Sequence, residues 1–236
     1  MQLFYTTEID GLYGTLPEVE ARHCLRALRM RTGDTLQITD GCGRLYTAVL
    51  TDQQDRRCPF AIQEVKEMPE AFPFRLHMAV APTKNPDRFE WFVEKAVEIG
   101  VTEISCLHCE HSERFTVKAE RMERLMVSAM KQSLHYRLPL FHPEVSATGF
   151  IRQQQNTENQ RFIAWCGDNM ESTPLKQACR QGGDIVVMIG PEGDFSPEEV
   201  RLARECGFQT VSLGQSRLRT ETAAVVACTI VHCIHM

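Results

Sequence analysis

The pattern of apolar and polar positions divides the chain into two parts with different predicted elements. In the first part, alternation of apolar and polar side chains indicates short strands, and one stripe at helical spacing indicates a helix. The expected strands are 2–6, 35–39, 44–50 and 59–65, and the expected helix is 17–30. A turn signal at 40–43 and a polar stretch at 51–57 separate the strands. Residues 1–70 are therefore expected to form a small β-rich domain.

From residue 74 onward, strand-like runs alternate with helical stretches. Two prolines between residues 68 and 73 disfavour helix and mark a linker. The expected strands are 75–81, 103–107, 161–165, 184–189 and 210–213, and the expected helices are 86–99, 118–134, 173–180, 197–205 and 220 to the C-terminus. This alternation predicts an α/β domain over 74–236, with a mostly parallel sheet and ligand sites at the carboxyl ends of its strands.

Composition agrees with a globular protein of two domains. The chain has 236 residues, of which 43% are hydrophobic and 24% charged, close to average globular usage. It starts without a basic segment followed by an apolar one, and no apolar run reaches the ~18 residues of a membrane span. We therefore expect a cytoplasmic protein that does not enter a membrane. Its ten cysteines are scattered, so reduced thiols serving as small core residues are expected.

The net charge of −5 argues against an indiscriminate binder of polyanions. A nucleic-acid role would need a local basic patch, and the first part of the chain offers one. Its members are Arg22, His23, Arg26, Arg29 and Arg31, followed by Arg56 and Arg57. The alternative interpretation is a solvated helix face.

The strongest local signal is an apolar strand that runs into a glycine-containing loop and then a helix start. Ser196 suits the helix N-cap, Pro197 the first helical position, and Glu199 completes a capping box. Gly190 and Gly193 allow the backbone to turn sharply and to approach a ligand. A ligand-binding loop is the functional hypothesis, and an ordinary strand-to-helix turn is the alternative.

A second strand, loop and helix start follows. Thr220 is a candidate N-cap for the last helix, and Glu221 lies in its first turn, where the helix dipole alone could explain a carboxylate. Arg217 and Arg219 lie beside Gly214 in the loop. Because a guanidinium presents paired donors, these arginines could hold a phosphate or a base carbonyl.

Three rival chemistries lack their required residues. The chain has no Gly-x-x-x-x-Gly-Lys-Ser/Thr, which disfavours a nucleotide phosphate site. No Gly-x-Gly-x-x-Gly follows the first strand of the α/β part, which disfavours a nicotinamide-dependent oxidoreductase. The segment Cys106-Leu-His-Cys-Glu-His111 has no second cysteine pair to complete a zinc site and no helix start to activate a thiol, so partly buried thiols are expected there.

Several motifs, taken together, resemble one family. Ile189-Gly-Pro-Glu-Gly-Asp-Phe-Ser196 and Leu213-Gly-Gln-Ser-Arg-Leu-Arg-Thr-Glu-Thr-Ala223 resemble the cofactor loops of the RsmE family, the ribosomal RNA uridine-N3 methyltransferases of the SPOUT superfamily. Other stretches fall in family order: His23-Cys-Leu-Arg-Ala-Leu-Arg-Met30, Glu94-Lys-Ala-Val-Glu-Ile-Gly-Val101, Ser112-Glu-Arg114, and Gln132-Ser133 with Arg137 and Pro139. The resemblance covers nearly the whole chain. It departs at Asp194, where glycine is common, and at Leu134-His135-Tyr136, which lengthens one segment.

The resemblance implies both a fold and a reaction. The fold is a PUA-like β-barrel over 1–70, which binds RNA, and a SPOUT domain over 74–236 with a deep trefoil knot, in a homodimer. General topology rules make knots very rare, so only the resemblance predicts this one. The reaction is methylation of N3 of a specific uridine in small-subunit (16S) ribosomal RNA within the assembled subunit, with S-adenosylmethionine as the cofactor and without a metal.

The resemblance also assigns residues. The cofactor would be held by Ala164, Trp165, Ile189, Gly190, Pro191, Glu192, Gly193, Leu213, Gly214, Gln215, Arg217, Leu218, Arg219 and Thr220. In catalysis, Arg219 would stabilise a uridine anion, while Glu192 or Glu221 would orient the base or relay its proton. RNA would be bound by Arg22, Arg26, Arg29, Arg114 and Arg137, with Arg56 and Arg57 supporting the backbone grip.

Two alternatives stay within RNA biology. The first is a SPOUT enzyme that modifies a ribose hydroxyl or another base, which the nearly full-length match disfavours. The second is an RNA-binding module that has lost catalysis, which the intact cofactor loops disfavour.

Overall fold

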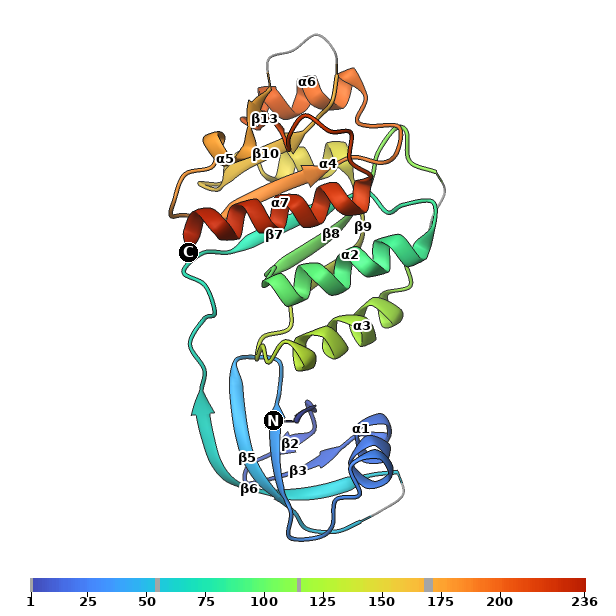
Figure 1. Ribbon diagram of the computed structural model, residues 1–236, viewed down its shortest axis with the longest axis vertical. Helices are drawn as coiled ribbons and strands as arrows, with labels where there is room; N and C mark the ends of the chain where they lie inside the picture. Colours follow the sequence, from blue (N-terminus) through green and yellow to red (C-terminus); the bar gives the residue numbers. More distant parts are fainter. Residues whose placement is uncertain (1, 54–55, 114–115, 168–171) are drawn as a thin grey trace. The chain divides into compact units, whose positions relative to one another are not determined.

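The computed structural model describes residues 2–53, 56–113, 116–167 and 172–236, and the chain divides into two compact units (Figure 1). The first unit comprises Met1–Ala71 and Val127–Leu138, and the second comprises Phe72–Met126 and Pro139–Met236. The division falls within helix α3 (Ala119–Gln132), so the chain contributes to the first unit twice.

The first unit contains a six-stranded sheet in the order β1-β4-β5-β6-β3-β2. The strands are β1 (Leu3–Tyr5), β2 (Ile9–Asp10), β3 (Tyr13–Leu16), β4 (Thr35–Thr39), β5 (Arg44–Leu50) and β6 (Cys58–Glu67). All pair in antiparallel fashion except β1, which runs parallel to β4. Alternate residues of β5, namely Tyr46, Ala48 and Leu50, are buried in one apolar cluster with Phe4 and Phe60, as the period-two pattern predicted.

The predicted helix over 17–30 is too long. Helix α1 (Glu18–Arg22) passes into one π-helical segment, η1 (His23–Ala27), and Arg29 has a left-handed φ of 56°, which no regular helix continues. The wider turn keeps Cys24 fully buried while Arg22 and Arg26 stay exposed. Packing of the short segment against the sheet thus overrides the uniform helical period.

The segment Val127–Leu138 is fastened to the first unit by ion pairs and hydrogen bonds. Lys131 pairs with the largely buried carboxylate of Glu20. Arg137 donates from Nη1 to the carbonyl of Cys42 at 2.7 Å, and its Nε lies 3.0 Å from Glu70 Oε1. The turn before β5 needs glycine at position 43, because φ is 94° and a Cβ atom would collide with the Arg137 guanidinium.

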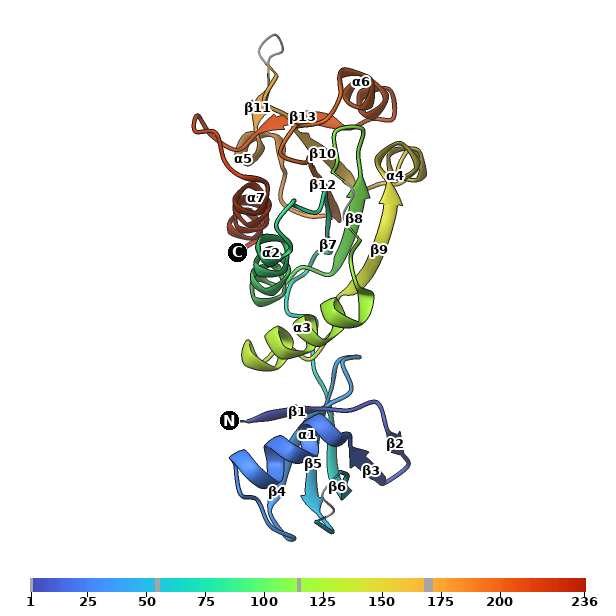
Figure 2. The ribbon, with the colours of Figure 1, turned by 90° about the vertical axis from the view of Figure 1, so that its right-hand side faces the viewer.

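The second unit contains a seven-stranded parallel sheet in the order β11-β13-β10-β12-β7-β8-β9. Its strands are β7 (Leu76–Val80), β8 (Glu103–His108), β9 (Leu140–Ser146), β10 (Gln160–Ala164), β11 (Thr173–Pro174), β12 (Ile185–Ile189) and β13 (Gln209–Ser212). Figure 2 shows α2 (Pro86–Ile99), α5 (Leu175–Ala178) and α7 (Thr220–His235) on one face, and α4 (Ala147–Gln153) and α6 (Pro197–Glu205) on the other. The predicted α/β domain with a mostly parallel sheet is confirmed. The trefoil knot stays a prediction of the resemblance.

Helix α2 has the predicted bounds because both ends carry strong local signals. The side chain of Asn85 accepts a hydrogen bond from the backbone of Asp87, and Pro86 occupies the first turn. At the other end, Gly100 adopts the left-handed conformation, with φ of 107°. No helix among the described residues is long and apolar enough to cross a membrane.

Four elements of the second unit, namely β9, α4, β11 and α5, differ from the sequence prediction. Strand β9 was not expected, because this edge strand is half exposed and shows no strict alternation of apolar and polar residues. The short helix α4 that follows it was also not expected. The predicted helix over 173–180 is reduced to the four residues of α5, because Thr173 and Pro174 pair with β13 as an edge strand.

A side-chain ladder crosses the three strands β7, β8 and β9. His77 Nε2 lies 2.8 Å from Ser105 Oγ, and its Nδ1 lies 3.6 Å from Glu103 Oε1. The same Glu103 oxygen lies 2.8 Å from His142 Nε2. Phe150 of α4 covers the His77 ring edge-on. Burial outweighs the attraction of Glu103 and, with the charges of His142 and Arg75, lowers the pKa of His77 to about 4.

This shift predicts a loss of stability in mild acid. In the unfolded chain His77 takes up a proton near its ordinary pKa of 6.5, whereas the folded chain resists it until about pH 4. The unfolded state therefore binds more protons across that window, and the free energy of unfolding should fall by up to about 3 kcal/mol as pH drops through it. Urea denaturation at successive pH values measures this slope. His77→Gln should flatten it, whereas His108→Gln, at an exposed position, should leave it unchanged. Equal slopes for wild type and His77→Gln would contradict the assignment.

Candidate functional site

The main cavity of the second unit, of about 960 Å³, lies at the carboxyl ends of β10, β12 and β13. This is the edge at which parallel α/β sheets bind ligands. Of the residues assigned to the cofactor and to catalysis, those that line it are Ala164, Trp165, Ile189, Gly190, Pro191, Glu192, Leu213, Gly214, Gln215, Arg217, Leu218, Arg219, Thr220 and Glu221. Gly193 belongs to the first loop but does not line the cavity. The two glycine loops therefore meet, although about 20 residues separate them in sequence.

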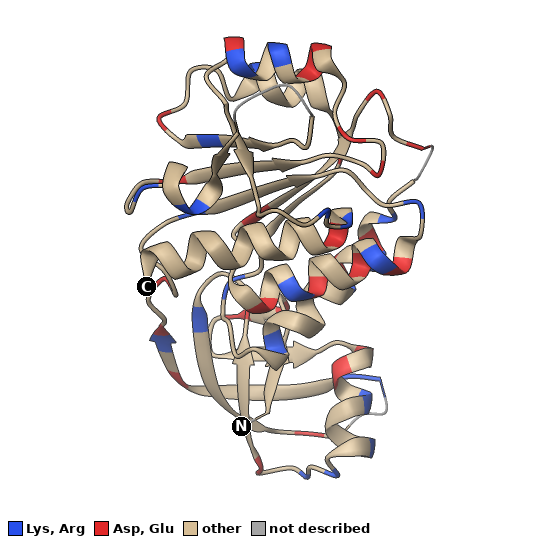
Figure 3. Cartoon of the chain, turned by 45° about the horizontal axis from the view of Figure 1, so that its top comes forward, with Lys and Arg blue, Asp and Glu red and all other residues tan. Residues whose placement is uncertain are grey.

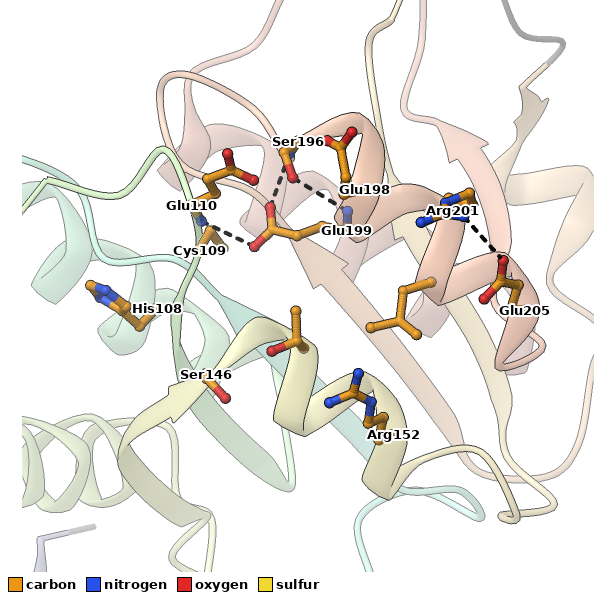
Figure 4. A pocket seen from close by; sticks show the side chains of 12 residues that line it. His108, Cys109, Glu110, Ser146, Arg152, Ser196, Glu198, Glu199, Arg201 and Glu205 are labelled. Carbon is orange, nitrogen blue, oxygen red and sulfur yellow. Dashed lines mark hydrogen bonds and ion pairs between the residues drawn. The ribbon is translucent and has the colours of Figure 1, made fainter.

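The first loop is closed at its far end by the predicted capping box. The Ser196 side chain accepts from the backbone of Glu199, and the Glu199 carboxylate accepts from the backbone of Ser196 at 2.9 Å. The other Glu199 oxygen accepts from the backbone of Glu110 at 3.0 Å, a contact visible in Figure 4. Gly190 permits the loop to fold back, because a Cβ atom there would come within 3.1 Å of the Phe195 ring and backbone.

Neighbouring loops hold the first loop through its side chains and carbonyls. Glu192 Oε1 accepts from the backbone of Lys84, which follows β7, at 3.0 Å. His111, which follows β8, lies with Nδ1 3.1 Å from the carbonyl oxygen of Gly193. Asp194 accepts from the backbone of Cys166, which follows β10, at 3.0 Å. The loop is thus connected to the ends of three other strands.

The second loop leads directly into helix α7. The N-cap is Arg219, not Thr220 as predicted, and no described side chain caps the helix. Thr220 is instead the first helical residue, and it is buried. The N-terminal end of α7, which carries partial positive charge, therefore faces the cavity wall with Glu221 in its first turn.

Arg88 is a site residue that the sequence analysis missed. It lies in the first turn of α2, and its Nε is 3.9 Å from Glu221 Oε1. The Glu221 side chain is only 10% exposed, and Arg88 forms an ion pair with it at the cavity wall. The other lining residues that were not predicted are Cys166, Gly167, Ser172, Asp194, Val211, Ser212, Ser216 and Ala223. Cys166, Asp194, Ser212 and Ser216 adjoin a predicted residue in sequence, whereas Arg88 carries no motif that could have identified it.

The cysteines near the β8 end are core residues. Cys106 and Cys109 are buried, and burial raises the pKa of both thiols. This agrees with the expected buried thiols. Over the described ranges, no group of three His, Cys, Asp or Glu side chains is arranged to hold a metal ion.

A smaller cavity of about 480 Å³ lies between α4 and α6 (Figure 4). Its charged side chains have mixed signs, and Arg201 and Glu205 on its rim form an exposed ion pair at 4.0 Å. None of its lining residues is a glycine, and of the first glycine loop only Ser196, at its end, reaches it. The larger cavity is therefore the candidate cofactor site.

The predicted RNA-binding arginines fall mainly in the first unit. Arg22, Arg26 and Arg29 are exposed along α1, η1 and the turn that follows, and Figure 3 shows acidic positions at the start of this helix and basic positions further along it. Arg22 forms an exposed ion pair with Glu18. Arg137 is half exposed but engaged by Cys42 and Glu70. Arg114 lies outside the described residues.

Two family models match the chain. One, described as an RNA methyltransferase domain, covers residues 70–232, and the other, described as an RNA methyltransferase PUA domain, covers residues 16–58. The second match confirms the predicted PUA-like character of the N-terminal part.

Similar proteins carry related names. A probable rRNA-methyltransferase from Porphyromonas gingivalis has a crystal structure that is 41% identical, covers 100% of this chain and 98% of its own, and superposes with a TM-score of 0.93. A ribosomal RNA small subunit methyltransferase E from Neisseria gonorrhoeae, bound to S-adenosyl methionine, is 28% identical over 99% of this chain and 98% of its own, with a TM-score of 0.86. A protein of that name from Aquifex aeolicus is 28% identical over 95% of this chain and 96% of its own length.

The RNA methyltransferase domain match extends over more than half of the chain, and the Porphyromonas structure aligns with all of it. The sequence resemblance to the RsmE proteins is thereby confirmed, and the chain belongs to the RNA methyltransferase family that is represented by the ribosomal RNA small subunit methyltransferase E proteins.

Proposed function

We propose that this protein uses S-adenosylmethionine to methylate N3 of a specific uridine in small-subunit (16S) ribosomal RNA. The observation that carries the proposal is the convergence of both glycine loops on one cavity that also contains Arg219, Glu221 and Arg88. The relatives named as ribosomal RNA small subunit methyltransferases support the substrate, and the relative bound to S-adenosyl methionine supports the cofactor.

The cavity fits such a cofactor by its shape and donors. Gly214 has a φ of 134°, a conformation that other residues rarely adopt, and the space beside its Cα is open, which allows a close backbone approach. Trp165 and Leu218 supply apolar surface, and the uncapped start of α7 supplies backbone N–H groups. We infer that these residues, with the rest of the two loops, hold the cofactor, which supplies an electrophilic methyl group when bound.

Uridine N3 carries a proton that must leave before or during methylation. The Arg219 guanidinium lines the cavity and can stabilise the negative charge that develops on the uracil ring. Among the carboxylates that line the cavity, Glu221 is the most buried, and Arg88 lies close enough to orient it, so it can accept the proton or relay it. Glu192 also lines the cavity, but one of its oxygens is committed to the Lys84 backbone, which suits a role in orienting the base.

We assign RNA positioning to residues 1–70 and the chemistry to residues 74–236. Arg22, Arg26 and Arg29 can bind phosphates without reading sequence, with Arg56 and Arg57 contributing from the same part of the chain. The other two predicted arginines, Arg114 and Arg137, lie beyond residue 70, and Arg137 belongs to the first unit. The family match to a PUA domain over residues 16–58 supports this assignment.

We also propose a homodimer. Helices α2 and α7 pack side by side on one face of the parallel sheet. Trp91 on α2 remains 44% exposed, and Val226, Ile230 and Ile234 on α7 are partly exposed. Apart from its histidines, α7 contains one acidic or basic residue, Glu221. A second copy would remove this apolar surface from water.

With ribosomal subunits as the substrate, the reaction would take place in the cytoplasm.

The reaction is tested on subunits from a strain that lacks the protein. Mass spectrometry of nucleosides from their 16S RNA should show no 3-methyluridine before treatment and about one methyl group per subunit after incubation with purified protein and labelled S-adenosylmethionine, since one specific base is proposed as the target. Naked RNA incubated in parallel reports whether the assembled subunit is needed. Label transferred to another base or to ribose would refute the N3 assignment.

The catalytic assignment is tested with Arg219→Ala and Glu221→Gln. Loss of the positive charge or of the proton acceptor should lower kcat by about 10²-fold or more in each case, because both groups act on charge that develops in the transition state. Single-turnover assays at saturating cofactor measure the effect. Arg201→Ala and Glu205→Gln provide a matched arginine and glutamate pair on the exposed surface of α6. Wild-type turnover in both cavity variants would refute the assignment.

The RNA-binding assignment is tested through salt dependence. The double substitution of Arg26 and Arg29 by alanine should weaken binding of subunit RNA, and it should reduce the slope of log K against log salt by about 1.4–1.8, the contribution of two phosphate contacts. Filter binding across a salt series measures both quantities. The control is the double alanine variant of Arg152 and Arg201, two exposed arginines of the second unit. An unchanged slope in the Arg26 and Arg29 variant would refute the assignment.

A further inference from the structure

We propose that Asp194 is a positioning residue that fastens the loop after β10 to the loop after β12 and thereby sets the affinity for the cofactor. The proposal rests on the cofactor site assigned above. It concerns a residue that was not among those assigned to the cofactor, although it lines the same cavity.

Both carboxylate oxygens of Asp194 accept hydrogen bonds from the backbone. Oδ2 accepts from the N–H of Cys166 at 3.0 Å, and Oδ1 accepts from the N–H of Phe195 at 2.8 Å. Phe195 belongs to the loop after β12, whereas Cys166 lies 28 residues earlier, in the loop after β10. One side chain therefore joins two walls of the cavity.

The backbone of Asp194 adopts a conformation that favours glycine. Its φ is 63°, and its N–H donates to the carbonyl oxygen of Pro191 at 2.9 Å, which closes a tight turn. Aspartate tolerates this left-handed region better than most residues, although less well than glycine. A carboxylate at this position thus costs conformational energy that its two hydrogen bonds offset.

The surroundings keep the carboxylate in place. His111 Nδ1 lies 3.2 Å from the Asp194 carbonyl oxygen and fixes the backbone of the turn. Burial and the charge of Asp194 raise the pKa of the Cys166 thiol, and Arg217 opposes the effect, so Asp194 and Arg217 act on the same part of the cavity. The carboxylate is therefore held between a fixed turn and the wall to which it binds.

The wall that Asp194 fastens contains the bulkiest side chain of the cavity. Trp165 precedes Cys166 in the chain, and the backbone N–H of Trp165 donates to the carbonyl oxygen of Val211 at a long 3.3 Å. The Trp165 ring lies against Gly167, where a Cβ atom would collide with it. Because a preformed wall needs no ordering when a ligand binds, the bond from Cys166 to Asp194 should strengthen binding without touching the reacting atoms.

The test compares Asp194→Gly with Asp194→Asn in the full chain. Glycine keeps the backbone conformation and removes only the carboxylate, so the melting temperature should not fall. Calorimetric titration with S-adenosylhomocysteine should show affinity weakened on the order of tenfold, as expected for loss of a hydrogen bond to a charged group. KM for the cofactor should rise in parallel, with kcat at saturation within about twofold of wild type. Asparagine, which can accept only one of the two bonds, should give an intermediate affinity.

Two further variants separate the possible failures. Leu134→Gly relieves a left-handed backbone in the first unit, with φ of 57°, and should leave cofactor binding unchanged. Ala223→Leu adds bulk at the cavity wall on α7 and should weaken binding if the cavity is the cofactor site. Wild-type affinity in Asp194→Gly, with binding lost in Ala223→Leu, would overturn the role of Asp194 alone. Wild-type affinity in both would overturn the site and the role together. A fall in kcat at unchanged affinity would also overturn the positioning role.

Discussion

The position of strand β12 between β7 and β10 is the constraint on which the site depends. All five residues from Ile185 to Ile189 are buried, and each pairs with a residue of β7 on one side and of β10 on the other. Because parallel strands end at the same edge of a sheet, this central placement brings the chain out at Gly190 between the ends of β7 and β10. The loop that follows is thereby surrounded by other loops from the moment it leaves the sheet.

The two glycine loops are stabilised by different means. The first depends on carboxylates, since Glu192, Asp194 and Glu199 each accept backbone N–H groups from another loop. The second depends on backbone conformation at Gly214 and on the start of α7. Rigid support for the first loop and a start of α7 that no described side chain caps together give a cavity with a preformed wall and with backbone N–H groups that can meet a ligand. This is the arrangement that a bound cofactor requires if positioning is to supply part of the rate.

The charges are also divided between the two units. In the second unit, Arg88, Arg217 and Arg219 lie around the carboxylates of Glu192, Asp194 and Glu221 in one cavity. In the first unit, Arg22 and Arg26 are exposed on the short helix whose π-helical segment keeps Cys24 in the core, and Arg29 is exposed in the turn that follows. A chain with a net charge of −5 can therefore contain both a basic surface patch and a cavity of mixed charge. Salt screens the electrostatic field of each group of charges, so each acts only on its own surroundings.

The sequence by itself determined the features that depend on near neighbours in the chain. The bounds of α2 follow from Asn85 and Gly100, the start of α6 follows from its capping box, and both glycine loops are evident from their residues. Only the tertiary structure decided which distant groups meet. Arg88 reaches Glu221, and Asp194 reaches Cys166, because β7, β10 and β12 are neighbours in the sheet and not in the chain. The same reason explains the errors at η1 and α5, where burial against the sheet and pairing with β13 outweighed local helical preference.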